Sequence, residues 1–218
     1  MLVSHIHKLI YIKTIKTAGT STEIFLEPYC ISDIDESHSR IATITEEGII
    51  GTRMSQKKAE RSEYYNHMSP KSIKEKLGED IFNNYSKIAN IRNPYDILVS
   101  HYFFRPTFDL YAKNKNLTFE EYLFKTDVVE KLAKNYKELL FIDDTFVIDE
   151  IIRYENLSED LEGLVKKLSL PEPKRVLSNY KESVVRKGKP YQMFYTDKTK
   201  ELVDRHFDFY MEKFNYQF

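Results

Sequence analysis

The chain has 218 residues, of which 41% are hydrophobic and 31% are charged, a composition typical of a folded globular protein rather than a disordered one. Its 33 Lys and Arg residues nearly balance its 34 Asp and Glu residues, and the net charge of -1 argues against a nucleic-acid partner held by bulk positive charge. This length predicts one domain over residues 1–218.

Three short β-prone runs are predicted in the first part of the chain, at residues 9–12, 41–44 and 49–50. The first run enters a polar turn, and a helix is predicted after it over residues 20–26, limited by Pro28. Ser69 and Pro70 begin another helix, because Ser can accept the first free amide and Pro suits the first helical position. Gly78 ends that helix.

The rest of the chain alternates strand and helix patterns. Residues 85–91 (YSKIANI) read as a buried strand, and Asn93 caps a helix that opens with Pro94. A further strand is predicted at residues 146–152, and further helices at 118–140, 157–168 and 197–210. Strands that alternate with helices predict a three-layer α/β fold with a central parallel sheet.

The turn after the first strand has the composition of an anion-binding loop. It consists of Lys16, Thr17, Ala18, Gly19, Thr20 and Ser21. Gly19 allows a tight turn, the amides after it can point at one anion, and Lys16 adds a full positive charge. The nucleoside-triphosphate loop differs, because its Lys follows the second Gly and a hydroxyl binds magnesium. An ordinary β–α turn with a solvated lysine remains the alternative.

A second candidate site begins where the strand 85–91 ends. Arg92 lies at the carboxyl end of that strand, where the sheets of α/β proteins form their ligand crevices. Ser100 follows roughly two helical turns further on, so the two side chains can grip one phosphate from two sides. The alternative is a capped helix in which Arg92 forms a structural ion pair with Asp96.

The pair of motifs KTAGTS and RNPYDILVSHYF resembles the sulfotransferases that use 3′-phosphoadenosine 5′-phosphosulfate (PAPS), and looks most like the branch that contains the carbohydrate sulfotransferases. The resemblance implies transfer of a sulfuryl group from PAPS to an acceptor hydroxyl, on a carbohydrate or another small molecule. It implies that residues 16–21 form a P-loop-like loop around the 5′-phosphosulfate, and that Arg92 and Ser100 hold the 3′-phosphate. Ile15 departs from the Pro that the family commonly has before the Lys.

A third segment, Arg186-Lys187-Gly188, resembles the Arg-Lys-Gly with which cytosolic sulfotransferases hold the same 3′-phosphate. The Gly-Asp-Trp that normally follows is absent, and the chain contains no Trp. A solvent-exposed basic turn is the alternative.

Transfer to an alcohol benefits from a base that takes the hydroxyl proton, and imidazole titrates near the working pH. In similar carbohydrate sulfotransferases a His between the two cofactor motifs and before a helix is the base. By that resemblance we predict Lys16 and His67 as the catalytic residues, and His101, beside Ser100, as the competing base.

No metal site is expected, because the histidines are scattered and no carboxylate cluster has ligand spacing. Cys30 is the only cysteine, so no intramolecular disulfide can form, and we expect a buried, neutral thiol. The apolar run at residues 1–12 is too short for a membrane span and lacks a cleavage site, which favours a cytoplasmic protein without a membrane partner.

Two other functions stay open. A nucleotide or small-molecule kinase would need magnesium and a carboxylate ligand. A non-catalytic module on the same fold would keep the phosphate contacts and bind a nucleotide or an anionic glycan without turnover.

Overall fold

The computed structural model describes residues 1–32, 41–53, 62–104, 117–175, 177 and 188–218. The chain divides into two compact units. The first contains Met1–Ile91 and Lys137–Tyr180, and the second contains Arg92–Tyr136 and Lys181–Phe218. None of the helices in the described ranges is long and apolar enough to cross a membrane.

The first unit is built on a six-stranded sheet with the order β3-β4-β1-β2-β5-β8. Its strands are β1 (Leu2–Ser4), β2 (Leu9–Ile12), β3 (Thr43–Ile44), β4 (Gly48–Ile50), β5 (Ser86–Ile91) and β8 (Glu150–Arg153). β5 runs parallel to both β2 and β8, whereas β1 is antiparallel to β2 and β4, and β4 to β3. The predicted α/β class is confirmed, but the sheet is mixed. Neighbours joined by a short turn, such as β1 and β2, must be antiparallel.

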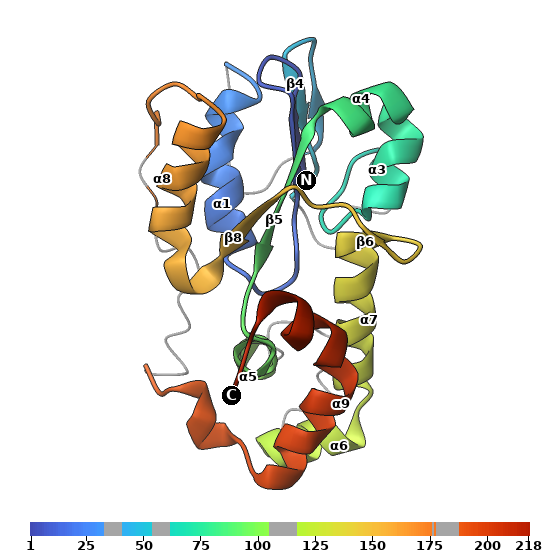
Figure 1. Ribbon diagram of the computed structural model, residues 1–218, viewed down its shortest axis with the longest axis vertical. Helices are drawn as coiled ribbons and strands as arrows, with labels where there is room; N and C mark the ends of the chain where they lie inside the picture. The colour runs from blue at the N-terminus through green and yellow to red at the C-terminus, as the bar shows by residue number, and fades with distance from the viewer. Residues whose placement is uncertain (33–40, 54–61, 105–116, 176, 178–187) are drawn as a thin grey trace. The chain divides into compact units, whose positions relative to one another are not determined.

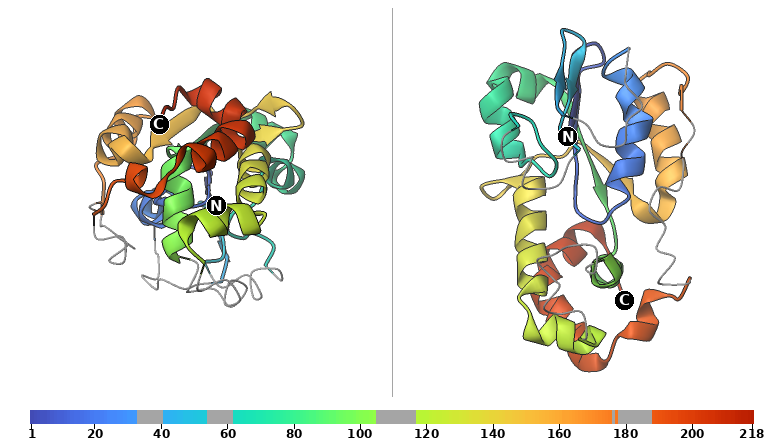
Figure 2. Two further views of the ribbon diagram at one scale, coloured as in Figure 1. Left: turned by 90° about the horizontal axis from the view of Figure 1, so that it is seen from below. Right: turned by 180° about the vertical axis from the view of Figure 1, so that it is seen from behind.

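Helices cover both faces of this sheet, as the three-layer prediction requires (Figure 1 and the right-hand view of Figure 2). α1 (Gly19–Leu26) and α8 (Leu157–Lys167) lie on one face, and α3 (Pro70–Leu77) and α4 (Glu79–Asn84) lie on the other. The core between the sheet and α1 and α8 contains Leu9, Tyr11, Leu26, Ile88, Ile152 and Leu161, among others. From α1, this core contains Phe25 and Leu26, so it packs the carboxyl end of the helix against the sheet.

Local capping explains several helix boundaries. The Ser69 hydroxyl accepts a hydrogen bond from the Ser72 amide at 3.2 Å, and Gly78, with a φ of 82°, follows the last residue of α3. The side-chain oxygen of Asn93 accepts a hydrogen bond from the Tyr95 amide at 3.0 Å, where α5 (Pro94–Phe104) begins. These starts and stops agree with the predictions from the sequence.

Two predicted elements are each divided. The predicted helix 118–140 is two helices, α6 (Phe119–Lys125) and α7 (Val128–Leu140), because Thr126 takes an extended backbone between them. The predicted strand 146–152 consists of β7 (Thr145–Phe146), which pairs with β6 (Phe141–Ile142), and the separate strand β8. Short 3-10 turns lie at Glu27–Tyr29, Tyr154–Asn156 and Tyr191–Phe194.

The second unit is helical in its described part. It contains α5, α6, most of α7 and the long α9 (Asp197–Phe214). Its core is rich in aromatic rings, including Tyr136, Phe207 and Tyr210, which pack edge to face. The hydroxyl of Tyr210 accepts a hydrogen bond from the Arg92 amide at 3.2 Å, so α9 helps to hold the residue at which the second motif begins.

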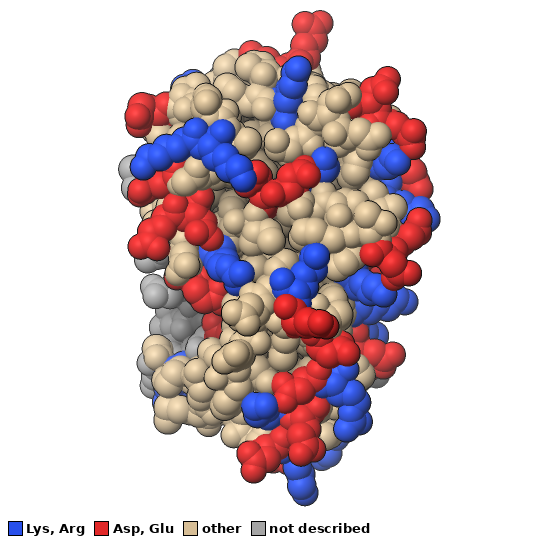
Figure 3. All heavy atoms as spheres, viewed as in Figure 1, with Lys and Arg blue, Asp and Glu red and all other residues tan. Residues whose placement is uncertain are grey.

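Charged side chains of both signs are interspersed on the face shown in Figure 3. This pattern fits the near-balance of acidic and basic residues in the sequence.

Candidate functional site

Residues 13–18 join the end of β2 to the start of α1 and contain the first half of the segment 16–21 that is predicted to bind the donor, so we call them the donor loop. Lys16 and Ala18 take left-handed backbone conformations, with φ values of 59° and 60°. α1 begins at Gly19 with no side-chain cap and no acidic residue in its first turn. The first amides of α1 therefore do not donate to a capping side chain, and no acidic residue offsets the positive end of the helix dipole. Both features suit the binding of an anion.

Gly19 is required by a close approach of side chains. A Cβ atom on Gly19 would lie 2.8 Å from Cγ of Lys13 and 3.3 Å from the hydroxyl of Tyr11. Without that atom, the Lys13 side chain can lie beneath the first turn of α1, where its Nζ is 3.4 Å from Oγ1 of Thr20. The turn thus brings a second lysine next to the predicted anion site, in addition to Lys16.

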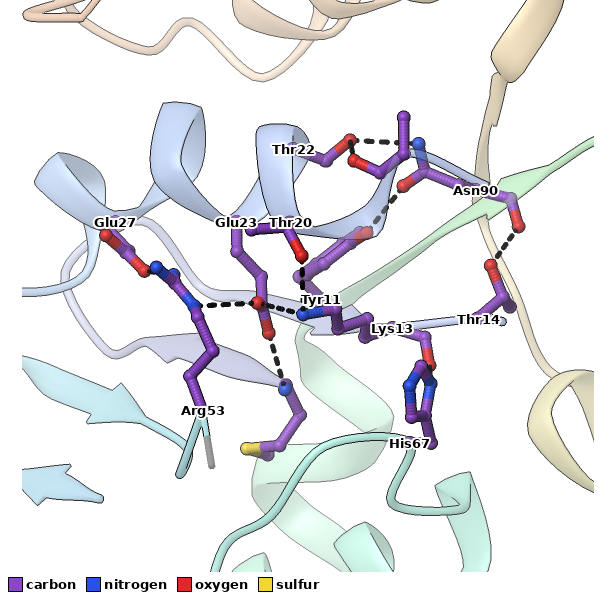
Figure 4. Close-up of polar contacts among 12 residues, drawn as sticks. Tyr11, Lys13, Thr14, Thr20, Thr22, Glu23, Glu27, Arg53, His67 and Asn90 are labelled. Atoms are coloured by element: carbon purple, nitrogen blue, oxygen red, sulfur yellow. Dashed lines mark hydrogen bonds and ion pairs between the residues drawn. The ribbon is translucent and has the colours of Figure 1, made fainter. Parts of the chain in front are cut away.

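A buried carboxylate holds the Lys13 ammonium in place (Figure 4). Glu23 is only 2% exposed, and its oxygens lie 2.5 Å from Lys13 Nζ, 3.1 Å from the Met1 amino group and 3.3 Å from Arg53 Nε. Burial alone would raise the pKa of Glu23, but the surrounding positive charges outweigh it and lower the pKa to about 2. Glu23 is therefore ionised at neutral pH. Arg53 also pairs with the buried Glu27.

A buried hydrogen-bond network joins the donor loop to β5 (Figure 4). The Asn90 side-chain amide donates to the carbonyl oxygen of Thr17 at 3.2 Å and to the hydroxyl of Thr22 at 2.9 Å. Its carbonyl oxygen accepts from the Tyr11 hydroxyl at 2.7 Å. The Thr14 hydroxyl donates to the main-chain oxygen of Asn90 at 2.6 Å. All five residues are fully buried, so the network belongs to the interior beneath the loop.

The six residues predicted to form the loop lie together, but their side chains differ in exposure. Lys16, Ala18 and Thr20 are partly exposed, whereas Gly19 and Ser21 are buried. The Thr17 hydroxyl lies 2.8 Å from that of Thr14 in the interior. The predicted contact of Thr17 with the donor therefore depends on its amide and not on its hydroxyl.

His67, the predicted base, contacts the donor loop. It precedes α3 with a φ of 57°, and its Nδ1 lies 2.9 Å from the Lys13 carbonyl oxygen. A carbonyl oxygen only accepts hydrogen bonds, so Nδ1 carries the proton and Nε2 keeps its lone pair when the ring is neutral. This tautomer suits a ring that must take up a proton at Nε2.

The surroundings of His67 favour the neutral ring. Loss of hydration and the nearby Lys13 ammonium lower the pKa of His67 to about 4. His67 is nevertheless exposed to solvent, so its ring can exchange protons with water. A lowered pKa leaves the imidazole unprotonated at pH 7.

His101, the competing candidate, lies on α5 in the second unit. Its Nδ1 is 2.8 Å from the hydroxyl of Tyr122, and the two rings stack with their centroids 6.3 Å apart. A tyrosine hydroxyl can donate or accept, so this contact does not fix the tautomer of His101 as the Lys13 carbonyl fixes that of His67.

The residues predicted for the 3′-phosphate also lie in the second unit. The Nε and Nη2 atoms of Arg92 are 2.8 Å and 2.6 Å from one Asp96 oxygen, so the ion pair considered as the alternative is present. A guanidinium carries five N–H donors, so this ion pair is compatible with a phosphate contact. Ser100 is half-buried on the same helix, α5. Arg186 and Lys187 lie outside the described residues, and Gly188 is exposed with a φ of 70°.

The single cysteine, Cys30, does not present a reactive thiol. Cys30 is buried, its thiol lies 3.5 Å from the Leu26 carbonyl oxygen, and burial raises the pKa of the thiol. A thiol with a raised pKa is a poor nucleophile at neutral pH. Among the described residues, no three His, Cys, Asp or Glu side chains gather as a metal site would require.

The structure adds Lys13, Glu23 and Asn90, which the sequence analysis did not single out. A signal for Asn90 exists in the sequence, because one amide interrupts the apolar run KIANI near the carboxyl end of a predicted strand. Lys13 likewise follows the strand 9–12 directly. The partners of these residues, however, come from segments that are distant in the sequence.

Comparisons with known proteins identify relatives. A family model described as "Sulfotransferase domain" matches residues 4–205, which include the donor loop and the Arg92–Ser100 segment. An uncharacterized protein of Archaeoglobus fulgidus is 32% identical over 108 residues, which cover 46% of this chain and 81% of that protein. A search of the solved structures found no significant match.

Proposed function

Because the chain belongs to the sulfotransferase family, we propose that it transfers a sulfuryl group from PAPS to a hydroxyl group of a carbohydrate or another small molecule. The observation that carries this proposal is the contact of His67 with the donor loop. An imidazole with a fixed tautomer and a lowered pKa lies against a loop that leads into an uncapped helix start.

The donor loop is the proposed site for the 5′-phosphosulfate. Lys16 and the amides of residues 19–21 would hold its oxygens, and Gly19 leaves room for Lys13 below them. The bound donor would supply the sulfuryl group. The positive charge and the oriented amides of the loop would stabilise the negative charge that develops on the leaving phosphate.

Arg92 and Ser100 are the residues that we propose to bind the 3′-phosphate. Arg186 and Lys187 are proposed to bind the same phosphate. A phosphate held by charge-assisted hydrogen bonds distinguishes PAPS from nucleotides that lack this group. His67 would take the proton of the acceptor hydroxyl at Nε2, because its Nδ1 proton is held by the Lys13 carbonyl. The carbohydrate acceptor and a cytoplasmic location are parts of the same proposal.

Calorimetry with two nucleotides tests the proposed donor. With EDTA present, 3′-phosphoadenosine 5′-phosphate should bind more tightly than adenosine 5′-phosphate. Arg92→Ala should remove most of the difference, because a hydrogen bond to a charged group is worth about 1.5–3 kcal/mol, or roughly 10- to 150-fold in affinity. Arg205→Ala, which removes an exposed arginine of the same unit, is the control and should bind like the wild type.

Three outcomes would contradict the proposal. Equal affinities for the two nucleotides would show that the protein has no site for the 3′-phosphate. A requirement for magnesium, or tight binding of magnesium-ATP, would favour a kinase. Tight binding of the 3′-phosphorylated nucleotide without transfer from labelled PAPS to any acceptor, in a screen of carbohydrates and other small hydroxyl compounds, would favour a non-catalytic module.

A further inference from the structure

We propose that Asn90 is a positioning residue that holds the donor loop in its anion-binding conformation. The kinetic part of this inference depends on the proposed function, whereas the conformational part does not. The argument starts from the side-chain amide of Asn90, which bonds both to the donor loop and to the helix that follows it.

The two acceptors of the Asn90 amide lie on either side of the anion-binding turn. The Thr17 carbonyl belongs to the donor loop, and the Thr22 hydroxyl belongs to α1 just beyond its first turn. One planar amide group therefore fixes the distance between the loop and the start of the helix. Since the Thr17 carbonyl can only accept, the NH₂ group must face it, and the Asn90 oxygen then faces the Tyr11 hydroxyl.

The loop needs such support because its backbone is strained. Lys16 and Ala18 have left-handed φ values although neither is glycine, and Thr17 lies between them. Such conformations cost free energy and persist only where the surrounding structure imposes them. Asn90 fixes Thr17 directly through the Thr17 carbonyl. A separate bridge runs from the main-chain oxygen of Asn90 through the Thr14 hydroxyl to the Thr17 hydroxyl, and it does not depend on the Asn90 side chain.

Packing alone does not explain an amide at this position. The neighbouring residues Ile88, Ala89 and Ile91 are apolar and fully buried, as expected for a central strand. A buried amide is costly unless its hydrogen bonds are made, and a fully satisfied buried network specifies one geometry. The geometry specified here is that of the loop proposed to receive the anion.

Asn90→Ala tests the inference, and Ser4→Ala is its matched control. Ser4 is also fully buried in the same sheet, and its hydroxyl donates to the Tyr29 carbonyl at 2.6 Å, away from the loop. Asn90→Ala loses the three hydrogen bonds of the Asn90 side chain, and Ser4→Ala loses the two of the Ser4 hydroxyl, which also accepts from the His7 amide. With Asn90→Ala we expect the KM for PAPS to rise about tenfold or more and kcat to fall, because the same loop is proposed to stabilise the leaving phosphate, while the acceptor KM stays within about twofold of the wild type. Ser4→Ala should keep the wild-type KM for PAPS.

Thr22 supplies a second, milder pair of variants. Thr22→Val removes the hydroxyl that accepts from Asn90 but keeps the branched shape, whereas Thr22→Ser keeps the hydroxyl. We expect Thr22→Val to raise the KM for PAPS. Thr22→Ser should keep a KM for PAPS close to that of the wild type. This pair keeps the inference testable if Asn90→Ala does not fold.

Hydrogen exchange where the loop meets α1 gives a readout that needs no donor. In the Asn90→Ala protein, the Thr22 amide, which donates to the Ala18 carbonyl at 3.1 Å where the loop meets α1, should exchange at least about tenfold faster than in the wild type, whereas Ser4→Ala should leave its rate unchanged. If the wild type binds no 3′-phosphorylated nucleotide but this difference appears, the proposed donor is wrong and the role of Asn90 stands. Unchanged exchange of the Thr22 amide and an unchanged KM in Asn90→Ala and Thr22→Val would overturn the inference.

Discussion

Replacing His67 by asparagine is the sharpest perturbation of the proposed chemistry. His67 has a φ of 57°, a left-handed conformation that asparagine adopts more readily than most residues. The asparagine NH₂ group can also donate to the Lys13 carbonyl, as Nδ1 of His67 does at 2.9 Å. The substitution therefore keeps the backbone and the hydrogen bond to the loop, and removes only the basic nitrogen.

The expected loss follows from the environment of the ring. A positioned general base contributes about 10²–10⁴-fold to a rate, which corresponds to roughly 3–5.5 kcal/mol in the barrier. Loss of hydration and Lys13 lower the pKa of His67, and a lower pKa makes a weaker base. We therefore expect a loss near the lower end, about 10²-fold in the rate of the chemical step. Donor affinity should change little, because the contact with the loop is kept.

Single-turnover kinetics with bound donor and excess acceptor measure this step, with His101→Asn as the control. The pH dependence adds a second measurement. The base works unprotonated, and the folded-state pKa of His67 lies below its ordinary value of 6.5. The wild-type rate should thus hold as the pH falls from 7 to 6, and decline only when the ring becomes protonated at lower pH.

Two results would refute this reasoning. If His101→Asn is the inactive variant and His67→Asn is nearly normal, the base lies on α5. If the wild-type rate falls with a midpoint at or above pH 6.5, the rate-limiting base is not a histidine with the lowered pKa described for His67.

Two further predictions concern the buried charges and the glycine beneath the loop. Because the folded-state pKa of Glu23 is lowered to about 2 from 4.5, its stabilisation is present above pH 4.5 and is lost as the pH falls toward 2. In urea unfolding, the free energy of unfolding of the wild type should decrease as the pH falls across that window. Glu23→Gln should start less stable and lose less over the same window. A decrease with pH that is equal in the two proteins would contradict this. Gly19→Ala should destabilise by about 1–3 kcal/mol and weaken nucleotide binding, because its Cβ would lie 2.8 Å from Lys13 Cγ. Gly163→Ala in α8, where the Cβ meets open space, is the control; equal effects of the two substitutions would refute the steric argument.

Elements with local signals were predictable from the sequence. α3 carries a Ser cap, a Pro in its first turn and a Gly at its end, and each of these acts within a few residues. β1 was missed because three residues, Leu2–Ser4, are too few to show a period. The mixed character of the sheet was missed for another reason. Strand direction depends on which strands become neighbours, and the alternation of strand and helix patterns alone favours parallel pairing.

The candidate site divides in the same way. Residues 16–21 could be proposed from the sequence because they are contiguous and have the composition of an anion loop, and their role stays a prediction. The roles of Lys13 and Asn90 could not be found, because Lys13 acts through Glu23 on α1 and Asn90 acts from β5. The inward direction of the Thr17 hydroxyl was equally hidden, since it depends on a contact with Thr14 across the turn.

The sheet order has a consequence for the stage of folding at which the anion loop takes shape. β1 and β2 pair through residues close in the chain, so the strand before the loop can form from a local hairpin. Tyr11 and Asn90 are 79 residues apart, and closing so long a segment costs more entropy and is slower than forming a hairpin. A nascent chain that ends before β5 thus contains the whole KTAGTS motif without the strand that supports it. The motif can take the conformation proposed for anion binding only after a strand synthesised much later has paired with β2.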